Sequence, residues 1–398
     1  MPAPSAIDIR IVPPEEFATL GIGAYAFGKS PQKPDPERQQ SRLKYAANTI
    51  GIAAFEDGEP QTSVVILKMT ENVRGRILPM GGVGGVASFP QARRKGYVRE
   101  MMTYGFGLMH ERGDVVSTLY PFRGSFYERL GYAEMQTNRF TTIKPEHLGP
   151  LLKMDLPGTV TQEGMDTGFD EWWAFIERVQ ANRHGFSLQE RERALELRDN
   201  NSRWVALVRE EGTVTGAMTF EITGYGETLR ADSFHAATPA ARYQLLSWIG
   251  RHVDQVADAV IELGPDDYPE LWFRDLDAQT STVHKHAWPA PMGRVISIAG
   301  LAGIAAGDAN PISIHITDDH CPWNTGVWTL GSDDGTLKVT PGGEASMDLA
   351  IQGLSALVWA GMDPATFRYR GWGAPTPDDQ ATLRALFPPA VPFLHEKF

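Results

Sequence analysis

The alternation of apolar and polar positions divides the first 150 residues into strands and helices. Residues 51–71 (GIAAFEDGEPQTSVVILKMTE) predict a hairpin that turns at residues 56–58, and residues 115–120 predict a further strand. Between them, residues 97–112 carry apolar side chains at the spacing of a helix with one buried face, and Gly113 predicts the end of that helix. This part of the chain therefore predicts a mixed α/β domain.

Similar patterns recur later in the chain. Residues 203–222 predict a hairpin with its turn at Glu211 and Gly212, and a helix follows with Thr238 as its N-cap and Pro239 at its first position. The last third predicts two helices, one around residues 349–360 and one capped by Thr376. It also predicts four short strands, over residues 294–298, 312–317, 326–331 and 335–340.

Length and tryptophan usage indicate several domains. The chain has 398 residues, which is long for a single core. All ten tryptophans follow residue 150, and prolines interrupt the pattern at 144–150 and 284–294. We therefore expect three domains, at residues 1–149, 150–288 and 289–398.

Composition narrows the class of protein. The 37 Lys and Arg residues against 49 Asp and Glu residues give a net charge of −12, which argues against a nucleic-acid binder. An acidic surface suits a cationic small molecule, and solubility alone is the alternative. The single cysteine, Cys321, allows no disulfide within the chain. The N-terminus lacks the pattern of a signal peptide, and no run of about 18 apolar residues exists. We expect a cytoplasmic protein without a membrane segment.

A cationic corner precedes the helix at residues 97–112. The stretch VASFPQARRKGYVREMM, residues 86–102, combines a strand, three consecutive cations, a glycine and the start of the helix. Free backbone N–H groups and the helix dipole at such a start favour an anion. A pyrophosphate is the natural guest, and a solvated surface corner is the alternative.

This corner resembles the acetyl-CoA loop of GNAT acetyltransferases, whose pattern is Gln/Arg-x-x-Gly-x-Gly/Ala. Arg93 and Gly96 match the pattern, whereas Val98 replaces its small residue. Together with the stretch LYPFRGSFYERLGY at residues 119–132, it is similar to the enhanced intracellular survival (Eis) family of N-acetyltransferases. The resemblance implies a catalytic GNAT domain, a second GNAT-like domain without the cofactor loop, and a sterol-carrier-protein-like domain.

The resemblance also implies the site residues. Tyr127 would be the general acid toward the departing thiolate, with Tyr132 the more probable packing residue of the same motif. Backbone N–H groups of the strand before the loop would polarise the thioester. The cofactor-binding residues expected on this basis are Val86, Ala87 and Ser88 for the thioester, Arg93, Arg94, Lys95, Gly96, Tyr97, Val98 and Arg99 for the pyrophosphate, and Phe122 and Arg123 for the pantetheine arm.

In the Eis family the base is the carboxylate of the last residue, which implies the carboxylate of Phe398 here. A terminal carboxyl has an ordinary pKa of about 3.3–3.7, so partial burial or a bridging water is needed for it to act as a base at neutral pH. A frayed tail is the alternative. Glu396 would add negative charge near a cationic substrate, or is simply a solvated tail residue.

Other motifs fit less well. The letters GAYAFGKS, residues 23–30, match the P-loop pattern, but a helix precedes them where a P-loop requires a strand. His284, His286, His320 and Cys321 lack a second pair at zinc spacing, so no metal is expected. Trp323, Trp328, Trp359 and Trp372 fit a core better than a ligand cavity.

The sequence thus predicts an acetyl-CoA-dependent N-acetyltransferase that acts on cationic amines. By resemblance, the substrates are aminoglycoside-like or lysine-type, and the protein is a homo-oligomer, with a hexamer as the family precedent. The proline-broken loop at residues 30–40 suits a lid or an ordinary surface loop. A non-enzymatic lipid carrier that uses the C-terminal domain is the rival hypothesis.

Overall fold

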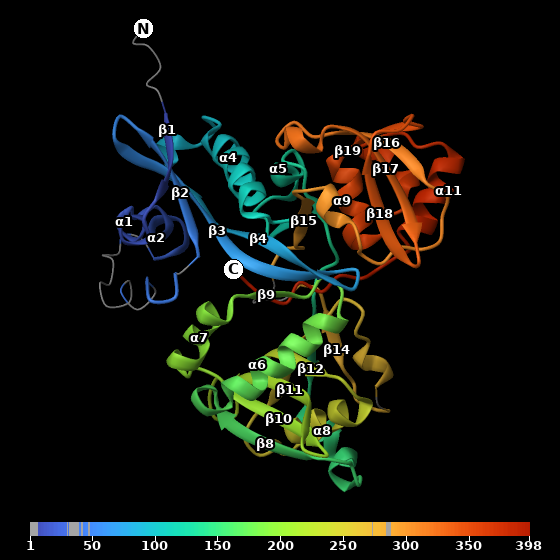
Figure 1. Ribbon diagram of the computed structural model, residues 1–398. Helices are drawn as coiled ribbons and strands as arrows, with labels where there is room; N and C mark the ends of the chain where they lie inside the picture. The colour runs from blue at the N-terminus through green and yellow to red at the C-terminus, as the bar shows by residue number, and fades with distance from the viewer. Residues whose placement is uncertain are drawn as a thin grey trace. The chain divides into compact units, whose positions relative to one another are not determined.

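The computed structural model describes residues 7–29, 31, 40, 43–46, 48–272, 274–283 and 288–398. The chain divides into two compact units (Figure 1). The first takes its residues from 1–135, 184–193 and 289–398, and the second from 136–183 and 194–288. The lid predicted over residues 30–40 and the pair His284 and His286 lie almost entirely outside the described residues.

A large mixed sheet forms the centre of the first unit, and its described part has eight strands. β3 and β4 are its longest strands and pair antiparallel, whereas β4 and β5 run parallel. In spatial order the strands are β1 (Asp8–Val12), β2 (Ile50–Glu56), β3 (Glu59–Val73), β4 (Arg76–Ser88), β5 (Val116–Leu119), β15 (Met292–Val295) and β6 (Ala133–Glu134), with β9 (Ser187–Gln189) paired to β3.

Two-residue turns close the predicted hairpins. Asp57 and Gly58 join β2 to β3 with φ values of 53° and 82°. Two successive positive φ values match the twist of paired strands, and glycine takes the second position without a Cβ clash. Glu211 and Gly212, at 50° and 80°, form the same kind of turn in the second unit. Both hairpin turns are where the sequence predicts them.

Helix α4 (Tyr97–Arg112) connects the parallel strands β4 and β5 (Figure 1). Met101, Met102, Phe106 and Met109 are buried in one cluster with Ile52 and other apolar side chains of the sheet. The predicted helix and its end at Gly113 are confirmed. The described part of the N-terminal segment includes the short helices α1 (Pro14–Thr19) and α2 (Ile22–Phe27), and α5 (Gly124–Glu128) follows β5.

The second unit is built on its own mixed sheet. Its described strands run in the order β14 (Gln279–Ser281), β7 (Arg139–Ile143), β13 (Asp258–Leu263), β12 (Thr228–Ala236), β11 (Thr213–Ile222), β10 (Trp204–Glu210) and β8 (Thr159–Gly164). Helix α8 (Pro239–Gly250) connects the parallel strands β12 and β13, and Thr238 caps it as predicted. The other helices of this part of the chain are α6 (Met165–Asn182) and α7 (Arg191–Asn200).

The C-terminal part of the first unit carries a small sheet and three helices. The strands run in the order β18 (Thr336–Pro341), β17 (Gly326–Asp333), β16 (Ile312–Thr317) and β19 (Met347–Ala350). The helices are α9 (Ile351–Ala360), α10 (Phe367–Arg370) and α11 (Pro377–Leu386). Thr376 and Asp379 form the capping box of α11, because each side chain bonds the backbone N–H of the other residue.

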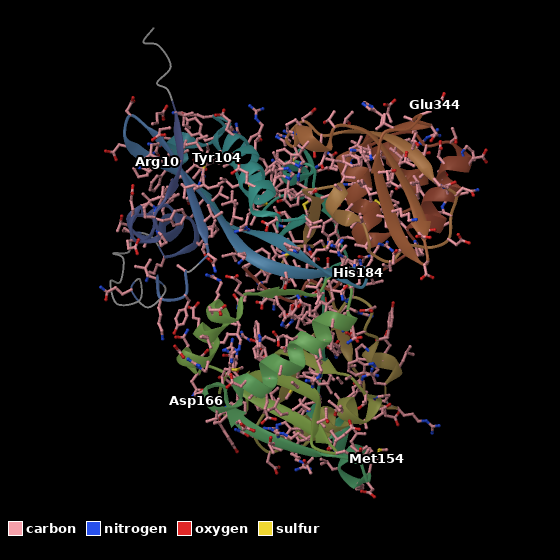
Figure 2. The ribbon with its side chains drawn as sticks, viewed as in Figure 1. Arg10, Tyr104, Met154, Asp166, His184 and Glu344 are labelled. Carbon is pink, nitrogen blue, oxygen red and sulfur yellow. The ribbon has the colours of Figure 1, made fainter. Side chains whose placement is uncertain are left out.

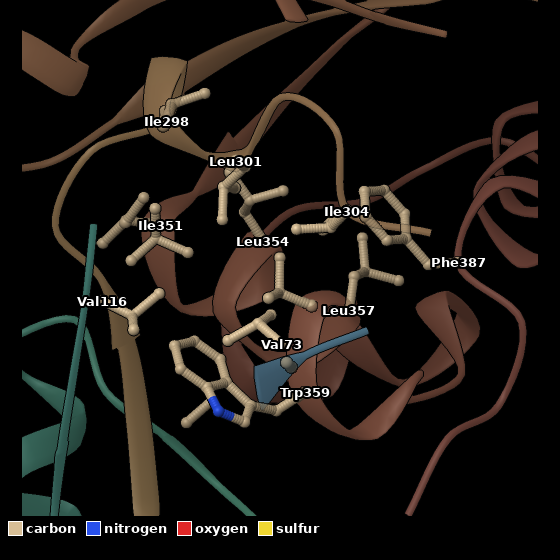
Figure 3. Close-up of a cluster of buried hydrophobic side chains, with 14 of the residues drawn as sticks. Val73, Val116, Ile298, Leu301, Ile304, Ile351, Leu354, Leu357, Trp359 and Phe387 are labelled. Atoms are coloured by element: carbon tan, nitrogen blue, oxygen red, sulfur yellow. The ribbon is translucent and has the colours of Figure 1, made fainter. Parts of the chain in front are cut away.

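One hydrophobic core joins this small sheet and its helices to the large sheet. Leu354, Leu357 and Trp359 of α9 share a cluster with Val73 and Val116 (Figure 3). Trp359 and Trp372 are buried there, which confirms the prediction that these two tryptophans belong to the core. The end of α9 is bound by the large sheet as well, since the Arg74 guanidinium donates to the carbonyl oxygens of Leu357 and Val358 at 2.8 and 2.7 Å.

Two strands pair differently from the sequence prediction. Arg294 and Val295 were expected in a strand of the third domain, yet β15 pairs with β5 and β6 in the large sheet. β7 precedes the boundary expected at 149/150 but pairs with β13 and β14 in the second sheet. Sequence spacing could not reveal either pairing, because each partner strand lies more than 100 residues away. The three-domain division at 149/150 and 288/289 stays a proposal.

Candidate active site

The cationic corner lies between the end of β4 and the start of α4. A short 3-10 turn, Pro90–Ala92, follows β4, and then Arg94 and Gly96 adopt the left-handed conformation with φ values of 65° and 92°. Gly96 is the N-cap of α4 and supplies no side-chain cap. The backbone angle favours glycine at this position. Space does not require it, because an added Cβ would meet no atom closer than 3.7 Å.

The corner presents free backbone donors. Within the described part of the chain, the N–H groups of residues 94–99 donate no hydrogen bond to another backbone group. The left-handed residues turn successive N–H groups toward a common side, and the dipole of α4 adds positive potential. Such a concave set of donors at a helix start binds phosphate oxygens. The predicted backbone residues Gly96, Tyr97 and Val98 are therefore brought together.

The cations of the corner do not act alike. Arg93, Arg94 and Arg99 are exposed and form no ion pair with any described residue. Lys95, by contrast, lies 2.7 Å from a carboxylate oxygen of Glu56, and the Tyr97 hydroxyl donates to the same carboxylate at 2.9 Å. The hydrogen bond to Glu56 raises the pKa of Lys95. Of the cations predicted to bind the pyrophosphate, Lys95 is thus already paired with Glu56, whereas the three guanidinium groups have no ion-pair partner among the described residues.

A gap in the sheet opens beside this corner. β4 and β5 pair only from Met80 and Val116 to Val83 and Leu119. β4 continues to Ser88, where Ala87 and Ser88 still pair with β3 on the other side. The β4 edge that faces away from β3 therefore has no strand partner over residues 84–88 in the described structure. The peptide groups that point from this edge, on the side of the predicted residues Val86, Ala87 and Ser88 that is turned away from β3, are available to a ligand.

The segment after β5 supplies aromatic side chains. Phe122 is exposed at 69%, and Arg123 is the exposed N-cap residue of α5. The Phe122 ring lies 5.3 Å from that of Phe126 and 5.5 Å from that of Tyr127. An exposed aromatic side chain that packs on the half-buried Phe126 and the buried Tyr127 is a feature that a ligand arm can cover.

The two tyrosines of this motif have different surroundings. Tyr132 is fully buried, and its hydroxyl lies 2.7 Å from Ser117 Oγ, which in turn donates to the Gly81 carbonyl oxygen. The Tyr127 side chain is also buried, yet its hydroxyl forms no hydrogen bond with the described residues. Burial raises the pKa of Tyr127, so the phenol stays protonated at neutral pH. Tyr132 is thereby a packing residue, whereas the Tyr127 proton remains available.

The last residue of the chain lies on β4. A Cβ atom added to Gly84 would meet the carboxyl carbon of Phe398 at 3.2 Å, and one added to Gly82 would meet its ring at 3.1 Å. The Phe398 ring also lies 6.0 Å from that of Tyr120, the residue that follows β5. Figure 1 shows the C-terminus beside β3 and β9. The chain end thus lies at the strand pair where β4 and β5 separate.

Sequence reasoning missed three residues at this place. Gly82 and Gly84 accommodate Phe398, and Tyr120 packs against it. The glycines stand in the run MGGVGGVAS, whose density of glycine inside a strand signals the close approach of another group. Nothing in the sequence around Tyr120 marks its role, because its partners lie more than 270 residues away.

The corresponding helix of the second unit lacks the donor corner. Helix α8 connects parallel strands as α4 does, but Thr238 Oγ accepts the N–H of Ala241 at 3.0 Å and Pro239 has no N–H. A capped helix start with proline offers few free donors to an anion. The free donor corner is therefore a feature of the first unit that the start of α8 does not share.

Other ligand classes find little support in the described residues. Gly23–Phe27, at the start of the P-loop pattern, lies within helix α2, so these residues form no phosphate loop after a strand. The described side chains contain no group of three or more His, Cys, Asp or Glu residues placed to hold a metal ion. His320 and Cys321 instead bond to Thr103 and Arg294. No described helix combines the length and apolar character that crossing a membrane requires.

Comparison with family models identifies all three parts of the chain. Residues 10–135 match a model described as an acetyltransferase (GNAT) domain, and residues 170–295 match a second model with the same description. Residues 297–395 match the model of a sterol carrier protein domain. No protein with a curated description matches the sequence. These matches confirm the predicted fold class of two GNAT domains and a C-terminal sterol-carrier-protein-like domain.

Several solved structures share the fold over the whole chain. A probable N-acyltransferase of unknown function from Enterococcus faecalis is 22% identical, with a TM-score of 0.85 over 99% of this chain and 100% of that one. A GNAT protein from Anabaena variabilis is 17% identical, with a TM-score of 0.83 and the same coverage. Eis1 from Mycobacterium abscessus is 18% identical, with a TM-score of 0.76 over 99% of this chain and all of its own.

Proposed function

We propose that this acetyltransferase, with its two GNAT domains and its sterol carrier protein domain, transfers the acetyl group of acetyl-CoA to an amine of a small cationic substrate. The matched family models support the acetyltransferase class. The observation that carries the choice of acetyl donor is the free N–H corner of residues 94–99, next to the unpaired edge of β4. A diphosphate joined to an extended amide arm has the chemistry that both features fit.

The first domain would bind the donor along this edge. The N–H groups of residues 94–99 and the guanidinium groups of Arg93, Arg94 and Arg99 would hold the pyrophosphate. Peptide groups on the edge of residues 84–88 that is turned away from β3 would bind the pantetheine amides and the thioester carbonyl, with Phe122 and Arg123 beside the arm. Acetyl-CoA would supply the acetyl group already activated as a thioester.

Tyr127 and Phe398 would divide the proton transfers between them. The Tyr127 phenol, protonated because burial raises its pKa, would donate a hydrogen bond and then a proton to the departing sulfur. The terminal carboxylate of Phe398 would accept the proton that the substrate ammonium has to lose before its nitrogen can react. Its position against Gly84 supports this assignment, because a carboxylate partly removed from water is a stronger base.

The substrate class follows from charge. The chain carries a net charge of −12, and the terminal carboxylate adds negative charge close to the gap in the sheet. An aminoglycoside-like or lysine-type amine has the complementary charge. Resemblance to the Eis family further suggests a cytoplasmic homo-oligomer, with a hexamer as the state to test by light scattering.

The rival function is a lipid carrier that uses the sterol carrier protein domain, and the match at residues 297–395 is the observation in its favour. A carrier would have no use for a free donor corner and an available tyrosine proton in the first domain. Calorimetry with acetyl-CoA separates the two functions, because only the enzyme needs to bind it.

The direct test is a screen of the purified full chain with acetyl-CoA against a panel of amines. The release of free thiol would be followed in time and the product identified by its mass increase. We expect turnover with aminoglycoside-like or lysine-type acceptors and none with neutral alcohols. Binding of acetyl-CoA without turnover of any amine would contradict the proposed acceptor class. Failure to bind acetyl-CoA would contradict the proposed function as a whole.

A further inference from the structure

A short strand from the middle of the sequence replaces β2 as the neighbour of β3. β2 pairs with β3 as far as Ile66, and β9 then pairs antiparallel with Met69, Thr70 and Glu71. β9 lies in residues 184–193, which belong to the first unit although the residues on both sides of them belong to the second. We call residues 184–193 the insertion. The question is what this insertion contributes to the first unit.

The C-terminal segment, Phe393–Glu396, lies along this insertion. The N–H of Phe393 donates to the His184 carbonyl oxygen at 2.9 Å, and the N–H of Glu396 donates to Ser187 Oγ at 3.3 Å. The imidazole of His395 stacks on the Phe186 ring with their centroids 4.4 Å apart. His184, the first residue of the insertion, is labelled in Figure 2.

Gly185 permits the close approach of the two segments. Its φ of 75° lies in the left-handed region, and an added Cβ would meet Pro392 Cβ at 2.5 Å and the Phe393 nitrogen at 2.7 Å. Both the backbone angle and the space therefore require glycine. The C-terminal segment therefore contacts the insertion closely at Gly185 as well as at Ser187.

A residue after β5 binds the tail from another direction. The Tyr120 hydroxyl donates to the Leu394 carbonyl oxygen at 3.3 Å, while its ring packs against that of Phe398. Leu394 is buried with 1% exposure. The segment from Phe393 to Phe398 is thus held both by the insertion and by the residue next to the gap in the sheet.

Glu396 adds a polar attachment two residues before the chain end. Its carboxyl accepts the backbone N–H of Gln189 and is close to the charges of Arg193 and Lys397. Burial raises the pKa of this carboxyl to about 7, and the residue is half-buried. The hydrogen bonds of Glu396 to Ser187 and Gln189 favour a fixed position over a solvated tail residue.

We infer that residues 184–189 are a docking strand for the C-terminal segment and that Ser187, through its bond to Glu396, is a positioning residue for the Phe398 carboxylate. This inference rests on the proposed function, in which that carboxylate accepts the substrate proton. Ser187 contacts neither substrate nor cofactor in this assignment. It acts through the tail alone.

The test compares Ser187→Ala and Gly185→Ala with Ser332→Ala, in full chains that end at Phe398 without a tag. Ser332 Oγ also accepts a backbone N–H, that of Ala309 at 3.4 Å, but lies on β17 away from the tail. We expect Ser187→Ala to lower kcat about threefold to tenfold, the effect of one hydrogen bond, and Gly185→Ala to lower it further. Affinity for acetyl-CoA should stay unchanged in all three variants.

A second measurement reports docking without relying on turnover. Carboxypeptidase A removes a C-terminal phenylalanine quickly and slows at the lysine before it, so release of Phe398 measures how often the tail leaves its site. We expect faster release from Ser187→Ala and Gly185→Ala, at unchanged melting temperature for Ser187→Ala, and wild-type release from Ser332→Ala.

The outcomes separate the inference from the proposed function. Wild-type release and wild-type kcat in both tail variants would overturn the docking role. Faster release at unchanged kcat would support docking and overturn the terminal carboxylate as the base. Faster release with lower kcat and unchanged affinity for acetyl-CoA would support both.

Discussion

The carboxyl carbon of Phe398 lies 3.2 Å from the point that a Cβ atom on Gly84 would occupy. Gly84→Ala therefore pushes on the terminal carboxylate directly. We expect kcat of the variant to fall at least about tenfold, because even a small displacement of a reacting group lowers the reaction rate strongly. Steady-state kinetics with acetyl-CoA and a competent amine would measure the loss.

Gly107→Ala is the matched control for that substitution. Gly107 lies inside α4, and a Cβ there would meet no atom within 4 Å. Alanine favours a helix by about 0.5–1 kcal/mol over glycine, so this variant should be slightly more stable and fully active. Equal kcat in Gly84→Ala and Gly107→Ala would show that Phe398 does not act at this position.

Tyr127→Phe removes the hydroxyl that we propose as the proton donor. We expect kcat to fall by about 10²–10³, the range for loss of a general acid, while acetyl-CoA binds as before. Tyr132→Phe is the control, because its hydroxyl bonds to Ser117 in the core and its loss should cost about 1 kcal/mol of stability with little change in kcat. Similar kcat losses in both variants would point to a structural effect.

The position of the terminal carboxylate can be changed without altering any other residue. Deletion of Phe398, or addition of one residue after it, should cut turnover strongly, because either change moves the carboxylate by one residue along the tail. Affinity for acetyl-CoA, measured by calorimetry, should remain near normal. A chain with one added residue that kept wild-type turnover would refute the terminal base.

The charges of the corner should contribute unequally to donor binding. Arg94→Gln removes an unpaired guanidinium and should weaken acetyl-CoA binding by about tenfold or more, the value of a charge-assisted hydrogen bond. Lys95→Gln should weaken it by less than about threefold, because the ammonium is already bound to Glu56. Calorimetry at two salt concentrations would compare them, and a larger effect from Lys95→Gln would contradict this ranking.

Glu71 should make stability depend on pH. It is fully buried with one oxygen bonded to Trp359 Nε1 at 2.9 Å, and burial raises its pKa from 4.5 to about 8. The folded chain therefore binds the extra proton between these values, so its free energy of unfolding should fall as pH rises from about 4.5 to 8. Glu71→Gln removes this dependence and should gain about 1–4 kcal/mol relative to wild type between pH 5 and pH 8.

Urea unfolding of both chains at several pH values would test this expectation. His184 changes stability in the opposite direction, because burial lowers its pKa from 6.5 to about 4 and stability is lost as pH falls through that window. The difference between wild type and Glu71→Gln cancels the His184 contribution. A difference that does not change with pH would contradict the assignment to Glu71.

Local signals made much of the fold predictable from the sequence. The helix over residues 97–112, the cap at Thr238 and the capping box at Thr376 each depend on residues within a few positions of one another. The cationic corner is of the same kind, since its turn, its glycine and the helix start are contiguous. Short-range patterns of this type identify an element before its partners are known.

Pairings across long sequence distances could not be predicted in this way. The pairing of Lys95 with Glu56, 39 residues earlier, has no signal in the sequence around either residue. The contact between Glu396 and Ser187 spans 209 residues. The sequence of β15 has no feature that indicates its pairing with β5. The role of Phe398 came from family resemblance rather than from its neighbours in the sequence.

The pairing of β5 with β15 has a consequence for synthesis on the ribosome. Leu119 and its partner Met292 are more than 170 residues apart, so at about 5–20 residues per second the β5 edge waits roughly 9–35 s for its neighbour. Until then the nascent first domain exposes unpaired peptide groups that invite association with other chains. A fragment that stops before β15 should therefore aggregate, and the intact polypeptide should complete its first domain only after translation has reached the third.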